Sequence, residues 1–373
     1  MNVVITGGRG FLGWHTACRL RSTRGLEPVI VGRAELCDDS LADTIAVADV
    51  ILHLAGVNRA GSDEVVESEN IAIASTLGDA IKRGARPVHV VYANSVQTVL
   101  DNAYGRGKSR AAAVLSAAVD AVGGSLADVL LPNLFGEHGR PHYNSFVATF
   151  CHEVARGRTP QVTEDREIGL LHAQAAAEVL IGAAEDRQVG TVQPEAESHR
   201  VSEILARLER FKACYERGEI PALTDRFSTD LFNAYRSYTF PQLFPFSPAL
   251  HSDGRGELFE VMRSHGGTGQ MFASTTVPGA TRGDHYHLHK VERFFVVRGE
   301  AEIALRRLYD GEVVRFRLSG DRPSFVDMPT LWVHNIKNVG TEELITVFWS
   351  DQLLDPENPD QYPERVELEV TAR

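Results

Sequence analysis

The stretch "NVVITGGRGFLGWHT", residues 2–16, decides the fold of the N-terminal half. A short apolar run leads into three spaced glycines, Gly7, Gly10 and Gly13, and a helix-forming sequence follows. In such a strand–loop–helix unit the glycines permit a tight turn, close approach to a pyrophosphate, and close packing of helix on strand. The start of the helix offers free N–H groups and a partial positive charge. The stretch therefore predicts a dinucleotide-binding loop.

Outward from this loop, residues 1–190 alternate short apolar runs with longer Ala- and Leu-rich segments. The apolar runs are rich in β-branched residues and end in Gly, Asn or Pro, as in "VILHLAG" (50–56) and "VHVVYANS" (88–95). This rhythm is typical of βαβ units. We expect an α/β, Rossmann-type parallel sheet with helices on both faces.

The second apolar run, "EPVIVGRAE" (27–35), bears on the cofactor. An acidic residue near the end of this strand usually binds the ribose hydroxyls of NAD, whereas a cation suits the 2′-phosphate of NADPH. Arg33 stands near the strand's end and Arg9 in the glycine loop could assist it, which favours NADPH. Glu35 is a rival that could take the NAD role.

A second motif, "YGRGK", places Lys108 four residues after Tyr104 at the start of an alanine-rich helical run. Residues at this spacing share one face of a helix. A neighbouring ammonium and the nicotinamide ring would lower the high pKa of a tyrosine and let Tyr104 protonate a carbonyl oxygen. Ser95, at the end of a predicted strand, could hydrogen-bond the same oxygen. We interpret the three as catalytic.

"TGGRGFLG", "LHLAGVNR", the serine of "NS" and "YGRGK" resemble the extended short-chain dehydrogenase/reductase family. The resemblance implies substrate contacts from "LPNLFG" and "YNSFVATFC", at Asn133, Tyr143 and Asn144. Where the family often has Val-Asp-Asp, this chain has "LLHAQAAAEV" with His172 and Gln174. The implied cofactor contacts are Gly7, Gly10, Phe11, Leu12, Gly13, Arg33, Leu54, Ala55, Gly56, Tyr104 and Lys108.

The pattern of residue types in the sequence changes after residue 200. A charged amphipathic helix is predicted over 200–220, and a Phe- and Pro-rich stretch follows it. Beyond residue 245, runs such as "VERFFVVRG" and "ELITVFWS" read as strands separated by turn residues, which predicts an all-β sandwich or barrel. We expect a reductase domain over residues 1–243, including the helical segment, and a β domain over 244–373.

Histidines crowd the stretch "GDHYHLHKVE", residues 283–292. Alternate residues of a strand point to one face, so His285, His287 and His289 could all face the same way. Glu292 follows, and His334 stands further on in "PTLWVHNIKN". In an ordinary soluble domain such crowding of imidazoles has no structural purpose.

The spacing of these residues from Gly279 to Gly299, and "PTLWVHNIKN" after it, resemble the two motifs of the cupin family. The resemblance implies a small β-barrel holding a metal through His285, His287, Glu292 and His334. Imidazoles with one carboxylate suit zinc, which we prefer, or another divalent metal. Leu331 stands where many cupins have glycine. His289 is left over, as a partner of the ligands, an acid/base or a partly exposed residue.

A reductase followed by a cupin resembles the CapF family of bifunctional capsular-polysaccharide UDP-sugar enzymes. "DLFNAYRSYTFP", "DGRGELFEV" and "NVGTEELITVFWSDQLLDPENPD" also look like that family. The resemblance implies NADPH-dependent reduction of a UDP-linked 4-keto-6-deoxy-N-acetylhexosamine, with epimerisation at carbon 3 in the cupin. His251, His289 and Tyr286 are candidates for the epimerase base. Two alternatives stay open: a reductase or epimerase of another nucleotide sugar with a non-catalytic metal-stabilised dimerisation module, and an iron cupin oxygenase fused to a dehydrogenase.

Composition sets outer limits on function. The formal net charge of -12 over 373 residues argues against a nucleic-acid or anionic-membrane partner, both of which need a basic surface. The four cysteines form no CxxC pair, which favours a reducing compartment. With no signal-like or transmembrane stretch, we expect a cytoplasmic protein. We also expect a homodimer or higher homo-oligomer.

Overall fold

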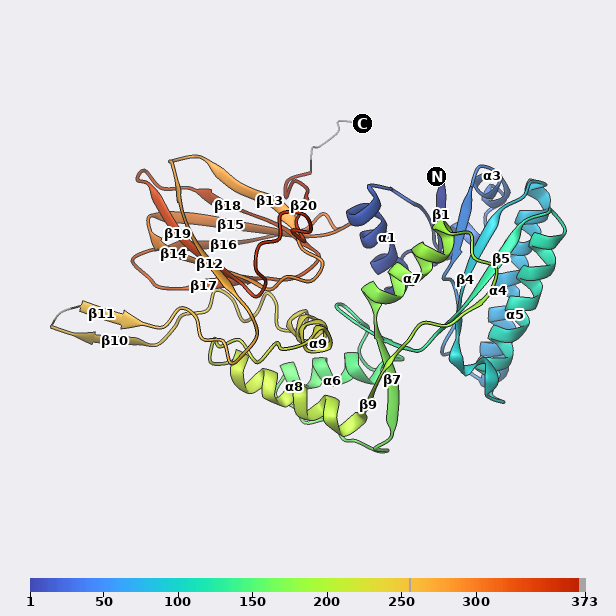
Figure 1. The fold of residues 1–373 in the computed structure, drawn as a ribbon, viewed down its shortest axis with the longest axis horizontal. Helices are drawn as coiled ribbons and strands as arrows, with labels where there is room; N and C mark the ends of the chain where they lie inside the picture. The colour runs from blue at the N-terminus through green and yellow to red at the C-terminus, as the bar shows by residue number, and fades with distance from the viewer. Residues whose placement is uncertain (255, 369–373) are drawn as a thin grey trace. The chain divides into compact units, whose positions relative to one another are not determined.

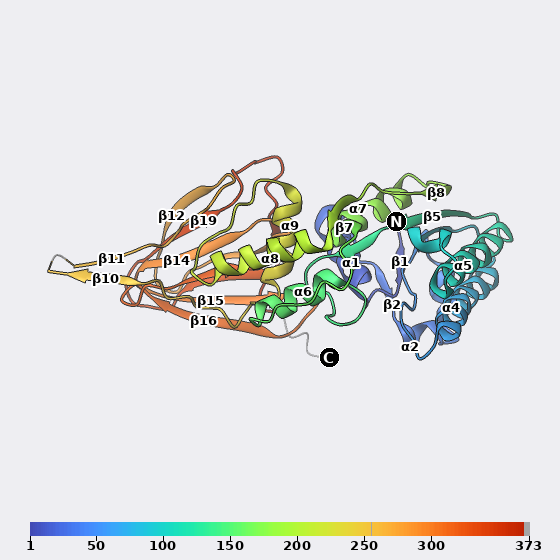
Figure 2. The ribbon, with the colours of Figure 1, turned by 90° about the horizontal axis from the view of Figure 1, so that it is seen from below.

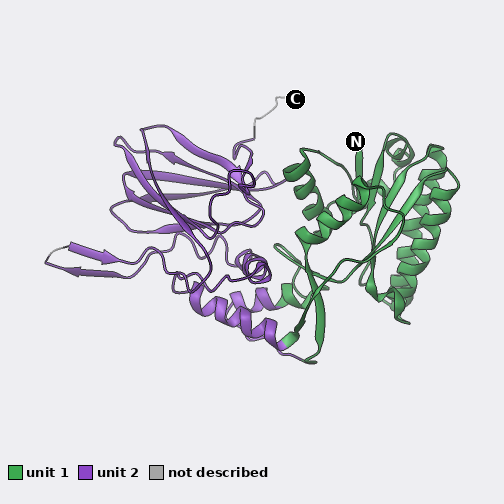
Figure 3. Ribbon diagram, viewed as in Figure 1, with its two compact units in different colours: residues 1–149, 163–201 green, residues 150–162, 202–373 purple. Residues whose placement is uncertain are grey.

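The computed structural model describes residues 1–254 and 256–368. The chain divides into two compact units: unit 1 contains residues 1–149 and 163–201, and unit 2 contains residues 150–162 and 202–373 (Figure 3). The domain boundary predicted at residue 243 stays a prediction, because a compact unit and a folding domain need not have the same limits. Across the described residues, no helix has both the length and the apolar character that crossing a membrane requires.

Unit 1 is built on a six-stranded parallel sheet in the order β2-β1-β3-β4-β5-β8. β2 and β8 are the edge strands of this sheet and β1 lies beside β2, and the loop after β1 emerges at the sheet's carboxyl edge (Figure 1). The strands are β1 (Val3–Thr6), β2 (Val29–Val31), β3 (Val50–His53), β4 (His89–Ser95), β5 (Ser125–Leu131) and β8 (Gly190–Val192).

Helices cover both faces of this sheet, as predicted (Figure 2). Because successive strand residues point to opposite faces, Val4 packs in the core with α4 and α5, and Ile5 packs in the core with α1 and α7. The two apolar faces explain why the strand sequences are continuously hydrophobic. The helices of this layer are α1 (Phe11–Arg24), α2 (Arg33–Leu36), α3 (Leu41–Ala46), α4 (Asp63–Gly84), α5 (Ala103–Asp120) and α7 (Ala173–Glu185).

A smaller three-stranded sheet, in the order β6-β7-β9, completes unit 1. β6 and β7 are parallel, and β7 and β9 are antiparallel. The predicted substrate segment therefore follows a short strand of its own. The remaining elements here are η1 (Val96–Val99), β6 (Asn133–Phe135), α6 (Phe146–Ala155), β7 (Glu167–His172) and β9 (Glu197–Arg200).

The described part of unit 2 contains most of α6, the helices α8 and α9, and two antiparallel sheets in the orders β12-β19-β14-β17 and β16-β15-β18-β13-β20. The charged helix predicted over 200–220 is α8 (Val201–Tyr215), and α9 (Arg226–Arg236) follows it within the predicted junction. The strands are β12 (Gln270–Thr276), β13 (Thr281–Tyr286), β14 (Glu292–Arg298), β15 (Glu300–Arg307), β16 (Val313–Ser319), β17 (Phe325–Met328), β18 (Trp332–Asn338), β19 (Leu344–Ser350) and β20 (Tyr362–Pro363).

A separate hairpin of β10 (Leu250–Asp253) and β11 (Gly256–Phe259) extends away from the two sheets of unit 2 (Figure 1). The fold class predicted from the sequence is confirmed: a parallel Rossmann-type sheet in the N-terminal part and antiparallel all-β sheets in the C-terminal part.

A buried ion pair lies at the centre of unit 2. The guanidinium of Arg293 binds both carboxylate oxygens of Asp327, at 2.6 and 2.9 Å, and both side chains are almost fully buried. Arg293 also donates to the carbonyl of Gly218, just after α8, at 2.6 Å. Each of the three guanidinium nitrogens of Arg293 donates to an acceptor. These hydrogen bonds offset the free-energy cost of removing the charge from water. The pair therefore joins the end of α8 to the strands β14 and β17.

The packing of α1 on β1 yields a prediction. A Cβ added at Gly13 would lie 2.2 Å from the Gly7 carbonyl oxygen and 2.6 Å from the Gly8 Cα. Since both atoms belong to backbone, we expect Gly13→Ala to destabilise unit 1 by about 2 kcal/mol and to weaken dinucleotide binding. Urea unfolding and cofactor fluorescence titration measure the two effects.

The matched control is Gly182→Ala in the middle of α7, where an added Cβ meets nothing within 4 Å. Because alanine favours helix over glycine, this variant should gain up to about 1 kcal/mol. Equal stability changes in the two variants would show that the close approach at Gly13 does not constrain the fold.

Candidate functional site

The glycine loop joins β1 to α1 and presents the start of this helix at the carboxyl edge of the sheet. Gly7 has a φ of 70°, and the N–H of Gly10 donates to the Gly7 carbonyl at 2.9 Å. Among the described residues no side chain caps α1, whereas Ser62 caps α4 and Asn102 caps α5. The first N–H groups of α1, at the predicted contacts Phe11 and Leu12, are thus left for a ligand. A pyrophosphate fits this arrangement.

The cations predicted to select the cofactor differ in their surroundings. Arg9 forms a two-pronged ion pair with Glu35, at 2.7 and 3.1 Å, and Glu35 also accepts from the Gly32 N–H at 3.0 Å. A hydrogen bond from its own backbone N–H, and then those from Arg9 and Gly32, hold the pKa of Glu35 below its ordinary value. Arg33 is exposed at the start of α2. Glu35, the rival for an NAD ribose, is therefore paired with Arg9, the residue expected to assist Arg33.

The loop after β3 brings Leu54, Ala55 and Gly56 toward the predicted catalytic lysine. A Cβ on Gly56 would lie 3.9 Å from Lys108 Nζ and 3.0 Å from Asn70 Oδ1. Asn70, on α4, accepts from the Val57 N–H and donates to the Val57 carbonyl. Sequence reasoning missed Asn70, because an asparagine inside a helix gives no local signal of a contact thirteen residues away.

Ser95, Tyr104 and Lys108 come together at the carboxyl end of β4. Ser95 is the last residue of β4, and Tyr104 and Lys108 lie on the first turns of α5. A Cβ on Gly105 would lie 2.4 Å from the Gln97 carbonyl oxygen, so the glycine of "YGRGK" lets α5 approach the turn after Ser95. A hydrogen bond from Ser95 is among the influences on the pKa of Tyr104. The predicted constellation is thus assembled in space.

The lysine is the most constrained group of the three. Lys108 is almost fully buried, donates to the Ala93 carbonyl at 2.6 Å, and lies 4.1 Å from the centre of the Tyr92 ring. Burial lowers the pKa of Lys108 to about 7, against an opposing attraction from Asp128. The carboxylate of Asp128 is itself held by Asn94 at 2.7 Å.

Burial raises the pKa of Tyr104 to about 12, and the hydrogen bond with Ser95 opposes this only in part. The lowering expected from the sequence depends on the nicotinamide ring as well as on the ammonium, so it stays a prediction. A phenol with a high pKa stays protonated near neutral pH, which suits a group that donates a proton to a ketone.

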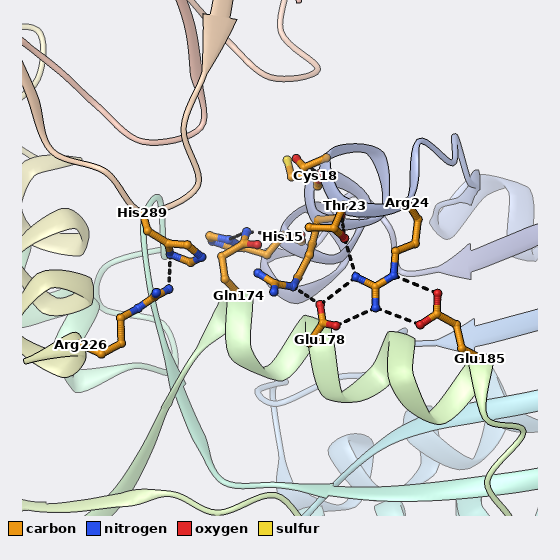
Figure 4. A network of polar contacts seen from close by, with 11 residues as sticks. His15, Cys18, Thr23, Arg24, Gln174, Glu178, Glu185, Arg226 and His289 are labelled. Carbon is orange, nitrogen blue, oxygen red and sulfur yellow. Dashed lines mark hydrogen bonds and ion pairs between the residues drawn. The ribbon is translucent and has the colours of Figure 1, made fainter. Parts of the chain in front are cut away.

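A buried polar cluster lies beside the glycine-loop helix. It consists of His15 on α1, Glu137 just after β6, His172 at the end of β7 and Gln174 on α7. The His172 Nε2 and Glu137 Oε2 lie 3.1 Å apart. Gln174 donates to His15 Nδ1 at 2.9 Å (Figure 4). With Nδ1 accepting, His15 donates from Nε2 to the Glu137 carbonyl at 3.0 Å. The residues that replace Val-Asp-Asp thus bind the segment after Asn133–Phe135 to α1.

Burial and the neighbouring side chains together determine which groups of this cluster are charged. Burial lowers the pKa of His15 to about 4, so its imidazole is neutral. Burial alone would raise the pKa of Glu137, but His172 and His15 outweigh it and hold the pKa well below its ordinary value. Ion pairs of Arg24 with Glu178 and Glu185, at 2.7 and 2.9 Å, add further links between α1 and α7 (Figure 4).

One of the three predicted substrate residues borders a pocket of unit 1. Asn133 begins β6 and borders a pocket of about 600 Å³ together with Val96, next to Ser95, and Gly169 on β7. Tyr143 lies under the Arg140 guanidinium, 5.0 Å from the ring centre. Asn144, which follows it, is exposed. The pocket brings Asn133 near Ser95 in the fold, while substrate binding by the three residues stays a prediction.

In unit 2 the four predicted metal ligands converge. One ligand atom from each of His285, His287, Glu292 and His334 lies within 4.8 Å of all the others. Glu292 Oε2 is 3.1 Å from His287 Nε2 and 3.4 Å from His334 Nε2. The Nδ1 atoms of the same two histidines face backbone carbonyls, at Asp360 and Trp332, which turns Nε2 toward the cluster. This donor set fits a divalent metal such as zinc.

Two positions with left-handed backbone shape the cluster. Asp284, with a φ of 60°, lies in a β-bulge of β13 that brings His285 opposite His334 on β18. Leu331, at the position where many cupins have glycine, has a φ of 66° and donates its N–H to the His287 carbonyl at 2.8 Å. The turn before His334 thus adopts the glycine-type conformation with a leucine.

The pKa values in the cluster favour neutral imidazoles at two of three histidines. Burial, with His334 and His287 nearby, lowers the pKa of His285 to about 3, and burial lowers that of His334. Burial would also lower the pKa of His287, but the Glu292 carboxylate outweighs it and raises the pKa. Since metals bind deprotonated ligands, binding here would displace that proton.

The candidates for an epimerase base lie outside the cluster. β13 ends at Tyr286, so the alternation expected to turn His289 inward stops before it, and His289 instead contacts Arg226 and Asp230 of α9 (Figure 4). Tyr286 is buried against Tyr362. His251 is exposed on the β10–β11 hairpin. The expectation that three histidines share one face holds for two of them.

The comparisons with known proteins match the C-terminal part of the chain in one case and nearly the whole chain in two others. Residues 251–362 match the family described as the polysaccharide biosynthesis C-terminal domain. A UDP-2-acetamido-2,6-beta-L-arabino-hexul-4-ose reductase of Pseudomonas aeruginosa is 31% identical over 366 residues, which cover 97% of this chain and 98% of the relative. The crystal structure of the capsular polysaccharide assembling protein CapF of Staphylococcus aureus superposes with a TM-score of 0.63 at 32% identity, covering 98% and 100% of the two chains.

A UDP-N-acetylglucosamine 4-epimerase of Bacillus cereus, 19% identical, covers 57% of this chain and 82% of its own with a TM-score of 0.50, a likeness of fold alone. The parallel sheet with its glycine loop defines a Rossmann-type domain joined to an all-β domain. The full-length matches are more particular: the chain belongs to the CapF family.

The buried lysine gives a prediction about pH. The pKa of Lys108 is about 7 in the folded protein against an ordinary 10.5. Between these values the unfolded chain binds a proton that the folded chain does not, so this group makes the folded state more stable as pH rises. The free energy of unfolding of the wild type should therefore rise relative to Lys108→Met by up to about 1.4 kcal/mol per pH unit in this window.

Urea unfolding of the cofactor-free protein at several pH values measures the difference. Lys82→Met, at a half-exposed lysine of α4, is the control and should run parallel to the wild type. Parallel curves for Lys108→Met as well would mean that Lys108 keeps its proton when buried.

Proposed function

We propose that the protein is an NADPH-dependent oxidoreductase that reduces the 4-keto group of a UDP-2-acetamido-2,6-dideoxy-hexos-4-ulose in polysaccharide and nucleotide-sugar biosynthesis. The observation that carries the proposal is the convergence of Ser95, Tyr104 and Lys108 beside the glycine loop. Its substrate is suggested by the reductase of Pseudomonas aeruginosa, which is related to the chain over nearly its whole length.

Each residue has one task in the proposed reduction. NADPH, when bound, supplies the hydride that is added to carbon 4. Tyr104 donates its phenolic proton to the ketone oxygen, and Ser95 hydrogen-bonds the same oxygen. The Lys108 ammonium, fixed by the Ala93 carbonyl, favours the phenolate that remains after transfer. Asn133 lies on the pocket beside Ser95 and would hold the sugar nucleotide.

The preference for NADPH is supported by the exposed Arg33 at the start of α2. An arginine there can pair with the 2′-phosphate. Glu35, the rival for an NAD ribose, already accepts from Arg9 and from the Gly32 N–H.

We further propose that the all-β domain is a cupin that holds zinc, or another divalent metal, and epimerises carbon 3. His285, His287, Glu292 and His334 would be the ligands, as their spacing within 4.8 Å supports. The hydrogen on carbon 3, next to the ketone, is acidic, and a bound metal would supply the positive charge that an enolate needs. Reduction in the same chain would then remove the labile keto sugar.

A second candidate function keeps the reductase, for this or another nucleotide sugar, and makes the cupin a metal-stabilised dimerisation module without chemistry. It is favoured by the position of His251, His289 and Tyr286 outside the ligand cluster. A homodimer or higher oligomer is supported by the β10–β11 hairpin, where Leu258 is 71% exposed, because isolated two-stranded hairpins are marginal in water. A cytoplasmic location stays a prediction.

The first test is Tyr104→Phe, assayed by cofactor absorbance with the keto sugar. Loss of the proton donor should lower kcat by about 100-fold or more. Tyr309→Phe, at an exposed tyrosine of unit 2, is the control. Running the assay with NADH as well tests the cofactor, and wild-type turnover in Tyr104→Phe would refute the assignment.

The second test separates epimerisation from reduction. The keto sugar is incubated with enzyme in deuterated water without NADPH, and NMR follows deuterium at carbon 3. We expect exchange with the wild type and with Tyr104→Phe, and a loss of more than about tenfold with His334→Gln. Undiminished exchange in His334→Gln would favour the non-catalytic module.

A further inference from the structure

The C-terminal segment, residues 351–366, returns from β19 to β13, the strand that carries His285. Its short strand β20 pairs with β13, with Pro363 opposite His285 (Figure 1). The Glu364 N–H donates to the Asp284 carbonyl at 2.9 Å, at the bulge of β13. Arg306 binds Glu364 at 2.8 Å with both side chains buried. The segment is therefore anchored to the sheet by contacts that do not involve the four ligand side chains.

Asp360 is the centre of this segment's contacts with the histidine stretch. Its carboxylate accepts three successive backbone N–H groups: Leu288 at 3.0 Å, His289 at 2.9 Å and Lys290 at 2.8 Å. Three donors converging on one carboxylate form an anion-binding concavity of backbone N–H groups. Since these donors directly follow His287, the carboxylate fixes the chain at the point where β13 has ended.

The same residue also contacts the imidazole of His287. The Asp360 carbonyl is hydrogen-bonded to His287 Nδ1. A carbonyl can only accept, so Nδ1 carries a hydrogen, and Nε2 is the nitrogen left for a metal, which would displace the proton that Nε2 directs at Glu292. Nε2 is the atom that lies 3.1 Å from Glu292 Oε2, inside the cluster. One residue thus sets both the ring orientation and the tautomer that a metal ligand requires.

The conformation of Asp360 suits this double task. Its φ of 42° is in the left-handed region, where Asp and Asn are tolerated better than most residues. The neighbouring Pro359 carbonyl accepts from Lys290 Nζ at 2.7 Å, which adds a second link to the histidine stretch. The backbone at 359–360 is therefore held where its carbonyl oxygens face residues 287 and 290.

We propose that Asp360 is a positioning residue for the metal ligand His287, and that the C-terminal segment preorganises the site through it. The inference rests on the proposed metal site and extends it to a residue some seventy positions away that contributes no ligand atom to the cluster. The segment's role goes beyond stability because its contacts select one nitrogen of one ligand.

The test measures metal affinity of the full-length protein by competition with a chromophoric chelator, using zinc, and the visible spectrum of the cobalt-substituted protein. Asp360→Ala should weaken zinc binding by about 10- to 100-fold and alter the cobalt bands. Asp360→Asn, which keeps the shape and the left-handed backbone, should show a smaller loss. His287→Asn, which lacks a ligand, should lose the most.

Asp355→Asn is the matched control, an exposed aspartate of the same segment whose carboxylate accepts only from nearby residues of that segment. It should bind zinc like the wild type. Zinc affinity and cobalt spectrum unchanged in Asp360→Ala, with only a lower unfolding temperature, would overturn the positioning role. A wild type that binds no metal would instead overturn the proposed metal site itself, so the two failures are distinguishable.

Discussion

The cost of burying an ionised side chain without partners governs how both candidate sites are built. Lys108 is buried against the Ala93 carbonyl and the Tyr92 ring, and its pKa falls because that environment only partly replaces water. Glu292 is buried with His287 and His334, which hold its pKa low although burial opposes this. Charges kept in such surroundings interact strongly with whatever binds beside them. The reactive groups are therefore also the ones whose removal changes the local charge balance most.

Backbone groups hold several of the buried side chains in both units. The Asp360 carboxylate accepts three N–H groups, and the imidazoles of His287 and His334 are each oriented by a carbonyl. Backbone partners are fixed by the fold and lose little conformational freedom when they bind, so they set geometry more sharply than flexible side chains do. The cluster of His15, Glu137, His172 and Gln174 follows the same rule in unit 1, since His15 donates to a backbone carbonyl.

Local sequence spacing was enough to predict where most of the candidate site residues lie. The glycine loop lies within one strand–loop–helix unit and "YGRGK" within the start of one helix, so spacing alone predicted which side chains lie together. The cupin-like spacing placed His285, His287, Glu292 and His334, and the four do converge. The same reasoning failed for His289, because β13 ends at Tyr286 and strand alternation ceases with it. It also left out the burial that raises the pKa of Tyr104, since burial is not written in the residues next to it.

The sequence by itself determined the alternation of strands and helices, the glycine loop before α1, and the grouping of Ser95 with Tyr104 and Lys108 and of His285, His287, Glu292 and His334, because each depends on periods and spacings that the backbone repeats. The tertiary structure alone decided which histidine turned away, what His172 and Gln174 contact, and that Asp360 lies against His287. Those contacts join residues 159 positions apart in the case of His15 and Gln174, and 73 apart in the case of His287 and Asp360. No local pattern encodes such pairs, since only the packing of the folded chain brings them within hydrogen-bond distance.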